Sequence, residues 1–135
     1  MCLTVVVGKS NADKFLERRP IIGTADHASV DCEFAAVIVG KGAELEVKSA
    51  LGVIVDGDSF RQKIPRGIQL ITCGISSKNT VSITSRTADK LTLSLNRGIR
   101  TASGICEPLE QPVDVPEGTD EFDVMAAFAA KMLLD

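Results

Sequence analysis

Small and basic residues follow three apolar runs of the chain, in positions where they could bind a ligand. Glycine lets the backbone approach a ligand closely, and lysine supplies a positive charge for an anionic group. If the runs are parallel strands, their carboxyl ends meet at one edge of a sheet, where open α/β sheets bind ligands. The ligand expected there is small and anionic, such as a nucleotide or nucleotide sugar. The predicted ligand-binding residues are Gly8, Lys9, Ser10, Gly40, Lys41, Cys73 and Gly74.

The two nucleotide-binding motifs that these residues suggest are both incomplete. Gly8-Lys9-Ser10 resembles the end of a P-loop, but the first glycine of that motif would stand at Leu3, inside an apolar run. Gly40-Lys41-Gly42 resembles the start of a dinucleotide-binding fingerprint, whose third glycine would stand at Leu45. A tight turn into a helix explains this second motif equally well. We therefore do not expect nucleotide hydrolysis, although the first motif and a helix N-terminus could still hold one anionic group.

The remaining reactive side chains form no recognised catalytic or metal-binding pattern. Asp56 and Asp58 flank a glycine, a pattern typical of a turn, and lack a third metal ligand at useful spacing. His27, the only histidine, lies beside Asp26 in a polar stretch, where a solvated side chain is a better interpretation than a general base. Cys73 could be a nucleophile, but a strand rather than a helix follows it, so we interpret it as a buried structural cysteine. We predict no catalytic residue, no metal and no cofactor.

Composition indicates one intracellular domain. The chain has 135 residues, of which 44% are apolar but only 4% aromatic, with no Trp or Tyr. A chain of this length forms a single α/β domain, 1–135, with a core of Val, Ile, Leu and Ala. The shortage of aromatic residues argues against nucleic-acid binding by base stacking. The four cysteines form no C-x-x-C pair, and no apolar run approaches the ~20 residues that cross a membrane, so we predict a cytoplasmic protein without membrane contact.

Charge is divided unevenly along the chain. The net charge is -3, but residues 107–135 contain eight acidic residues and one lysine. This acidic part could dock on a basic surface of a partner protein or of another copy of the chain. The alternative explanation is that an acidic helix start complements the helix dipole.

Branched aliphatic runs in the first half of the chain predict buried parallel strands, covered by helices on both faces of the sheet. A capping pattern at Ser10 and Asp13 predicts a helix that ends before Pro20. The spacing of apolar residues over 43–51 predicts a second helix. The expected strands are Leu3–Val7, Ala35–Val39, Val53–Val55 and Ile68–Thr72, with a short one at Ile21–Thr24.

The second half of the chain has a different pattern. Apolar and polar residues alternate over 81–83 and 91–95, which is typical of antiparallel strands with one wet face. Prolines between 108 and 116 exclude a central strand there, and apolar residues over 122–133 predict an amphipathic C-terminal helix. The predicted fold class is therefore α/β. A Rossmann-like, mostly parallel sheet forms the N-terminal half, and an antiparallel meander plus the C-terminal helix form the second half.

Part of this pattern resembles known proteins. The segments Leu70–Ser76 and Thr80–Ser85, then Leu95-Asn96-Arg97, Glu107-Pro108 and the alanine-rich terminal helix resemble a small bacterial protein family without an assigned function. Over residues 68–133 the same order resembles the end of the central domain of Mur ligases, the ATP-dependent peptidoglycan amino-acid ligases. The ATP loop of those proteins has no counterpart here, and the Asn that begins their corresponding helix is absent. The resemblance implies a Mur-ligase-like scaffold without the ligase machinery, and it transfers no catalytic residue.

Three functional hypotheses follow from these observations. The leading hypothesis is a non-catalytic α/β scaffold that binds a protein partner or forms a homo-oligomer. The alternative is a protein that binds a small anionic ligand at the carboxyl edge of its sheet. An enzyme with Cys73 as its nucleophile is the third hypothesis.

Overall fold

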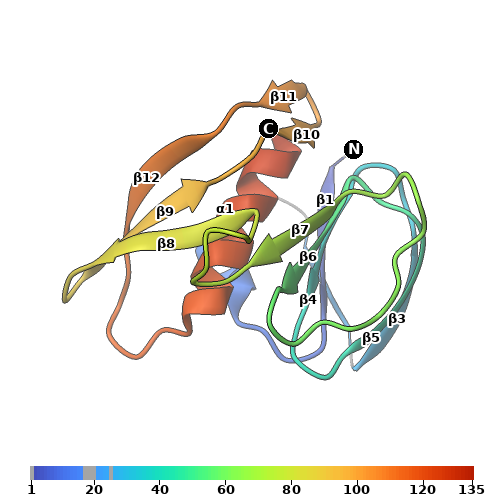
Figure 1. Cartoon of the computed structure of the whole chain (residues 1–135). Helices are drawn as coiled ribbons and strands as arrows, with labels where there is room; N and C mark the ends of the chain where they lie inside the picture. Colours follow the sequence, from blue (N-terminus) through green and yellow to red (C-terminus); the bar gives the residue numbers. More distant parts are fainter. Residues whose placement is uncertain (1, 17–20, 25) are drawn as a thin grey trace.

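The structure is a computed structural model that describes residues 2–16, 21–24 and 26–135. Within these ranges the chain is mostly β-structure, with one 3-10 helix and one α-helix (Figure 1). The strands are β1 (Leu3–Val7), β2 (Ile21–Thr24), β3 (His27–Asp31), β4 (Ala35–Val39), β5 (Glu44–Ser49), β6 (Gly52–Asp56), β7 (Leu70–Cys73), β8 (Val81–Arg86), β9 (Lys90–Leu95), β10 (Ile99–Thr101), β11 (Gly104–Cys106) and β12 (Leu109–Asp114). The helices are η1 (Ala12–Phe15) and α1 (Glu121–Leu134).

An eight-stranded sheet organises the molecule, in the order β12-β9-β8-β7-β6-β4-β1-β2. Neighbouring strands from β2 to β8 pair in parallel, whereas β9 and β12 pair antiparallel. All five residues of β4 are buried, because both faces of the sheet are covered at this point. Strands buried on both faces need apolar side chains at every position, which explains the continuous aliphatic runs in the sequence.

Two hydrophobic clusters lie on the opposite faces of the parallel strands. One contains Val6, Ile38 and Ile54 and packs against α1. The other contains Val5 and Val37 and packs against β3 and β5, which form a separate two-stranded parallel sheet. Successive side chains of a strand point to opposite faces, so the neighbours Val5 and Val6 belong to different clusters.

The predicted Rossmann-like α/β class is wrong. A Rossmann fold crosses between its parallel strands through helices. Here the chain crosses from β2 to β4 through strand β3, and from β4 to β6 through strand β5. From β6 to β7 it crosses as an irregular loop, 57–69, in which Phe60, Ile64 and Ile68 pack on the same cluster. The fold is mainly β, with a solenoid-like coil of strands next to a mixed sheet.

Strand β5 replaces the second predicted helix. Leu45 and Val47 are buried, and the charged residues on either side of them are exposed. Within a window of nine residues, the apolar positions fit a period of two as well as a period of 3.6. The available edge of β3 decides the outcome, because a strand there pairs its backbone and also buries Leu45 and Val47.

The first predicted helix is reduced to the short η1. The hydroxyl of Ser10 accepts a hydrogen bond from the backbone N–H of Ala12 at 3.2 Å. The same hydroxyl donates to the Asp123 carboxylate at 2.6 Å, a contact across 113 positions of the sequence. Ser10 therefore joins η1 to α1 and caps no long helix. The end expected before Pro20 lies outside the described residues.

Helix α1 lies in the hollow of the curled sheet (Figure 1). Ten successive residues from Phe122 to Lys131 include only one that is exposed, Lys131 itself. Strands β4, β6 and β7 of the large sheet contact the helix, and so do β8, β10 and η1. No helix in the described part of the chain has the length and apolar character needed to cross a membrane.

Candidate ligand site at the carboxyl ends of the parallel strands

The turns after β1 and β4 lie against each other at the carboxyl edge of the sheet. The backbone N–H of Gly40 donates to the carbonyl of Val7 at 2.8 Å. Beyond this bond, Lys9 and Lys41 face each other as an isolated antiparallel β-bridge. A Cβ on Gly40 would stand 2.5 Å from the Lys9 carbonyl oxygen, so only glycine lets the two turns approach this closely.

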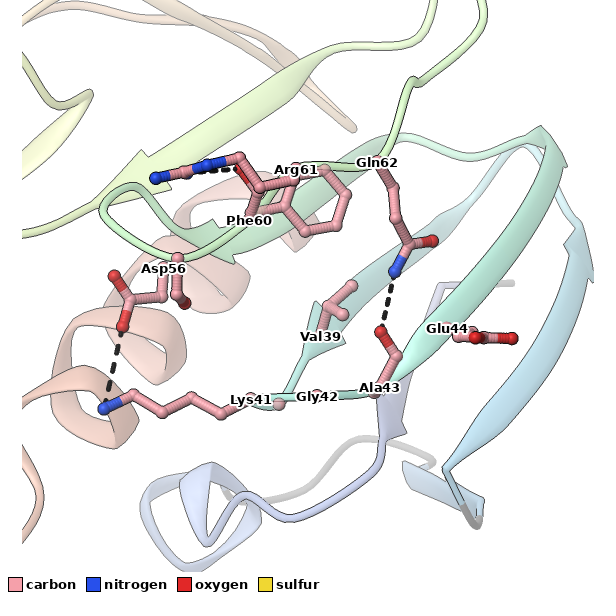
Figure 2. A pocket seen from close by; sticks show the side chains of 11 residues that line it. Val39, Lys41, Gly42, Ala43, Glu44, Asp56, Phe60, Arg61 and Gln62 are labelled. Atoms are coloured by element: carbon pink, nitrogen blue, oxygen red, sulfur yellow. Dashed lines mark hydrogen bonds and ion pairs between the residues drawn. The ribbon is translucent and has the colours of Figure 1, made fainter.

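Two surface pockets flank the bridge, and Lys41 lines both. The first, the Lys41–Gln62 pocket, has a volume of about 270 Å³. It is lined by Val39, Gly40, Lys41, Gly42, Ala43, Glu44, Asp56, Ser59, Phe60, Arg61 and Gln62, most of which are labelled in Figure 2. The second, the Lys9–Asp123 pocket, has a volume of about 560 Å³ and is lined by Gly8, Lys9, Ser10, Asn11, Lys41, Asp120, Phe122 and Asp123.

The Gln62 side chain fixes the wall of the Lys41–Gln62 pocket. Its amide nitrogen donates to the Ala43 carbonyl at 2.7 Å, and its amide oxygen accepts from the Leu45 N–H at 3.0 Å. The side chain thus pairs with the start of β5 as a neighbouring strand would, and holds the loop after β6 against it (Figure 2). This satisfies backbone groups at the edge of β5 that would otherwise need another partner.

The charged groups of this pocket balance one another. Lys41 Nζ lies 4.0 Å from Asp56 Oδ2, and the lysine side chain is 71% exposed. Such an exposed pair contributes little to stability and leaves the ammonium able to move. The Arg61 guanidinium bends back to donate to the carbonyls of Phe60 and Asp58 at 2.9 and 2.8 Å. Arg61 therefore stabilises the loop to which it belongs, and Lys41 is the cation of this pocket that is available to a ligand.

The Lys9–Asp123 pocket contains charges of both signs. Asp120 caps α1 by accepting a hydrogen bond from the Phe122 N–H at 2.9 Å. Asp123 is only 5% exposed and accepts the hydroxyl hydrogen of Ser10. In the part of the chain that the structure describes, no ion pair joins Lys9 to a carboxylate. The lysines and aspartates line the same pocket without neutralising one another in direct contacts.

The other two predicted ligand-binding residues, Cys73 and Gly74, line neither pocket. Cys73 is 1% exposed, and burial, with a smaller contribution from the charge of Asp56, raises the pKa of its thiol far above the usual range. A Cβ on Gly74 would stand 2.5 Å from the side-chain nitrogen of Asn79, which covers this strand end. The structure thus brings together five of the seven predicted residues.

Asp56 and His27, interpreted from the sequence as a turn residue and a solvated residue, have surroundings that fit these interpretations. Asp56 Oδ1 accepts from the Asp58 N–H at 2.9 Å, which is the hydrogen bond of an Asx-turn. His27 is exposed at the start of β3. Among the described residues, no three or more His, Cys, Asp or Glu side chains are grouped as they would be around a metal ion.

Sequence reasoning missed Asp120 and Asp123 as members of the site. They follow β4 by about eighty positions and β1 by more than a hundred, and only the packing of α1 beside η1 brings them near. A signal was available for Asp123, which lies on the buried surface of α1 together with Ala126 and Ala130. A carboxylate on such a surface needs a hydrogen-bond partner, and this need marks it as a residue to examine.

Comparisons with protein-family models, curated proteins and solved structures give no match. The resemblance to Mur ligases therefore stays a prediction.

Proposed function

We propose that this chain is a non-catalytic binding protein that holds a small ligand by an anionic group at the Lys9–Lys41 bridge. The observation that carries the proposal is the bridge itself, which sets two lysines directly opposite each other. Like charges in such positions destabilise a β-structure. An anion between them turns that repulsion into attraction for the ligand.

The surroundings of the bridge support binding rather than catalysis. Cys73 is buried and its thiol stays protonated, so it is not available as a nucleophile. The Ser10 hydroxyl donates a hydrogen bond to the Asp123 carboxylate, and no described histidine lies next to it that could act as a base. The lysines stand on turns that approach closely at Gly40, which fixes the spacing of their backbones before a ligand arrives.

Removal of the two lysines tests the proposal. We expect inorganic phosphate, a nucleotide, a nucleotide sugar or a small carboxylate to raise the melting temperature of the wild type at low salt, and less at high salt. The double variant Lys9→Ala, Lys41→Ala should lose this response and, without ligand, be as stable as the wild type or slightly more so.

Lys48→Ala is the matched control, because Lys48 is an exposed lysine near the far end of β5, away from the bridge. It should respond to the same ligands as the wild type does. If no anion shifts the wild type at any salt concentration, or if the double variant still responds, the proposal is wrong.

Self-association is a second proposed function, favoured by the two edge strands β2 and β3. β2 ends the large sheet and β3 ends the small one, and in the described part of the chain neither has a partner on its outer side. Ile22 of β2 is 50% exposed there. An unpaired edge with an apolar side chain can accept a strand from a second copy of this chain. Light scattering over a range of concentrations tests this proposal.

We propose a cytoplasmic location, supported by the cysteines. All four thiols, Cys2, Cys32, Cys73 and Cys106, are free. Free thiols are usual where the cell keeps cysteines reduced. The acidic C-terminal part remains a candidate surface for a protein partner.

A further inference from the structure

The Lys9–Asp123 pocket is lined by two lysines and two aspartates, and the ammonium of one of these lysines, Lys41, also lies 4.0 Å from Asp56 Oδ2. Lys9 and Lys41 come from the turns after β1 and β4. Asp120 and Asp123 come from the start of α1. A ligand that carries only negative charge gains from the lysines and is repelled by the aspartates. A ligand that carries only positive charge is attracted by the aspartates and repelled by the lysines.

The two carboxylates each have bonding capacity left. Asp120 uses Oδ1 to cap the helix, and Asp123 uses Oδ1 to accept from Ser10. A carboxylate has about four lone-pair directions, so both can accept further N–H donors. The hydrogen bond to Ser10 and the burial of Asp123 hold this carboxylate in place, and the burial strengthens its attraction for a cation.

Within the class of anionic groups, the pocket favours a singly charged group over a doubly charged phosphate. The nearest long helix starts with Asp120, Glu121 and Asp123, so its positive end is already complemented by negative side chains. The N–H of Ala12 is bound to Ser10. The Phe122 and Ala12 N–H groups are therefore occupied by side chains, and the lysines alone suit a single negative charge.

We propose that the ligand of this pocket is a small zwitterion, whose anionic group lies between Lys9 and Lys41 and whose ammonium group meets Asp120 and Asp123. This inference rests on the proposed function, because it uses the same lysines, and it adds the requirement for a cationic group. Opposite charges held apart on separate elements are complementary to a ligand whose own two charges are held apart by a short spacer.

Titration calorimetry at low salt with matched probes tests the inference on the full chain. The zwitterions are β-alanine, 4-aminobutyrate and taurine. Propionate and butyrate lack the ammonium group, and butylamine lacks the carboxylate. We expect at least one zwitterion to bind about tenfold more tightly, or more, than any of the three single-charge probes.

Two variants assign the two ends of the ligand. Asp123→Asn removes the negative charge but keeps an oxygen that can accept from Ser10, so the fold should survive. It should weaken zwitterion binding about tenfold and leave butyrate binding equal or stronger. Lys9→Gln should weaken both, whereas Lys48→Gln should change neither.

The outcomes separate this inference from the proposed function. If no zwitterion binds the wild type more tightly than propionate or butyrate does, the zwitterion inference is wrong, and anion binding stands as long as one anion still binds. If no probe binds and phosphate and nucleotides also fail, both are wrong. The comparison of probes on the wild type needs no variant, so it remains decisive even if Asp123→Asn does not fold.

Discussion

Single residues determine which groups are available at the carboxyl edge of the sheet. Gly40 has no side chain, so the turn after β4 can press against Lys9, and this contact creates the lysine bridge. Cys73 ends the neighbouring part of the same edge but is enclosed, with Asn79 covering the following Gly74. Two strand ends of the same sheet therefore have opposite chemical properties, one with accessible cations and the other with an inaccessible thiol.

The thiol of Cys73 should be unreactive in the folded protein. We expect a variant in which the other three cysteines are replaced by serine to react with a disulfide reagent only as fast as it unfolds. In the wild type the three partly exposed thiols, of Cys2, Cys32 and Cys106, should react first. Rapid labelling of the variant under native conditions would contradict the burial of this thiol.

The same burial makes stability depend on pH in the alkaline range. The pKa of Cys73 is raised on folding, so above the ordinary thiol pKa of about 8.5 the unfolded chain loses a proton that the folded chain keeps. The free energy of unfolding should therefore fall as the pH rises beyond that value. Cys73→Ala should remove this part of the pH dependence in urea titrations, whereas Cys106→Ala should leave it unchanged.

At the scale of elements, sequence patterns located the strands better than they identified the connections. The aliphatic runs of β1, β4 and β6 could be recognised because burial on both faces requires them. The connection over 43–51 was wrongly predicted as a helix, since its few apolar residues suit a strand as well as a helix. What decides between them is the open edge of β3, and the pairing of β3 with β5 is not visible in a local pattern.

The candidate site shows the same division between local and long-range information. The lysine and glycine positions after β1 and β4 were evident from the sequence, because they follow recognisable strands. The aspartates of α1 were not, because their place beside Lys9 depends on how the C-terminal helix packs into the curled sheet. A short-range pattern could identify Asp120 as a helix cap but not as part of a pocket.

An ion pair between Arg86 and Glu121 joins strand β8 to helix α1. The guanidinium of Arg86 in β8 donates to both oxygens of Glu121 at 2.6 and 2.9 Å. The side chains are 45% and 37% exposed, so the pair should contribute only about 0.5 kcal/mol, although its bidentate geometry is good. Glu121→Gln should lower the free energy of unfolding by about that amount at low salt, and by less in 1 M salt. Denaturant titration measures both values.

The pH dependence of this contribution follows from the lowered pKa of Glu121, which is due mainly to the hydrogen bonds from Arg86. The contribution should be complete above the unfolded pKa of about 4.3 and be lost as the pH falls through the lower pKa of the folded state. Asp114→Asn is the control, because Asp114 is 87% exposed and lies 3.7 Å from Lys90. An equal effect in both variants would mean that the bidentate geometry adds nothing.

On the scale of the whole molecule, the two edge strands of the large sheet, β12 and β2, differ in how well they are protected against pairing with another copy of the chain. The backbone N–H of Val115 donates to the Asp89 carbonyl at 2.8 Å. Together with the register of β12 and β9, this bond shows which residues of β12 direct their N–H groups toward β9. The N–H groups of the odd-numbered residues of β12 face β9. Pro112, which has no N–H, therefore lacks it on the outer side of the strand. A proline and acidic neighbours on an outer edge hinder the addition of another strand. The β12 edge is therefore protected against self-association.

The β2 edge has no comparable protection in the residues that the structure describes, so a dimer should form there. The register pairs Ile22 with Val5, which places this exposed side chain on the face covered by β3 and β5. Two copies related by a two-fold axis would pair β2 antiparallel with β2 and bury both Ile22 side chains. We expect light scattering to give a mass that rises toward that of a dimer as concentration increases.

Ile22→Lys should keep the protein monomeric, because a buried lysine pair at the two-fold axis would be repulsive and desolvated. Ile75→Lys is the matched control: Ile75 is 63% exposed in the loop after β7, at a distance from the β2 edge, and its replacement should leave the dimer intact. A wild type that stays monomeric at every concentration, or a dimer that Ile22→Lys does not weaken, would exclude the β2 edge as the interface. In either case the ligand pocket is unaffected, since it lies at the carboxyl ends of the strands and not along the outer strand.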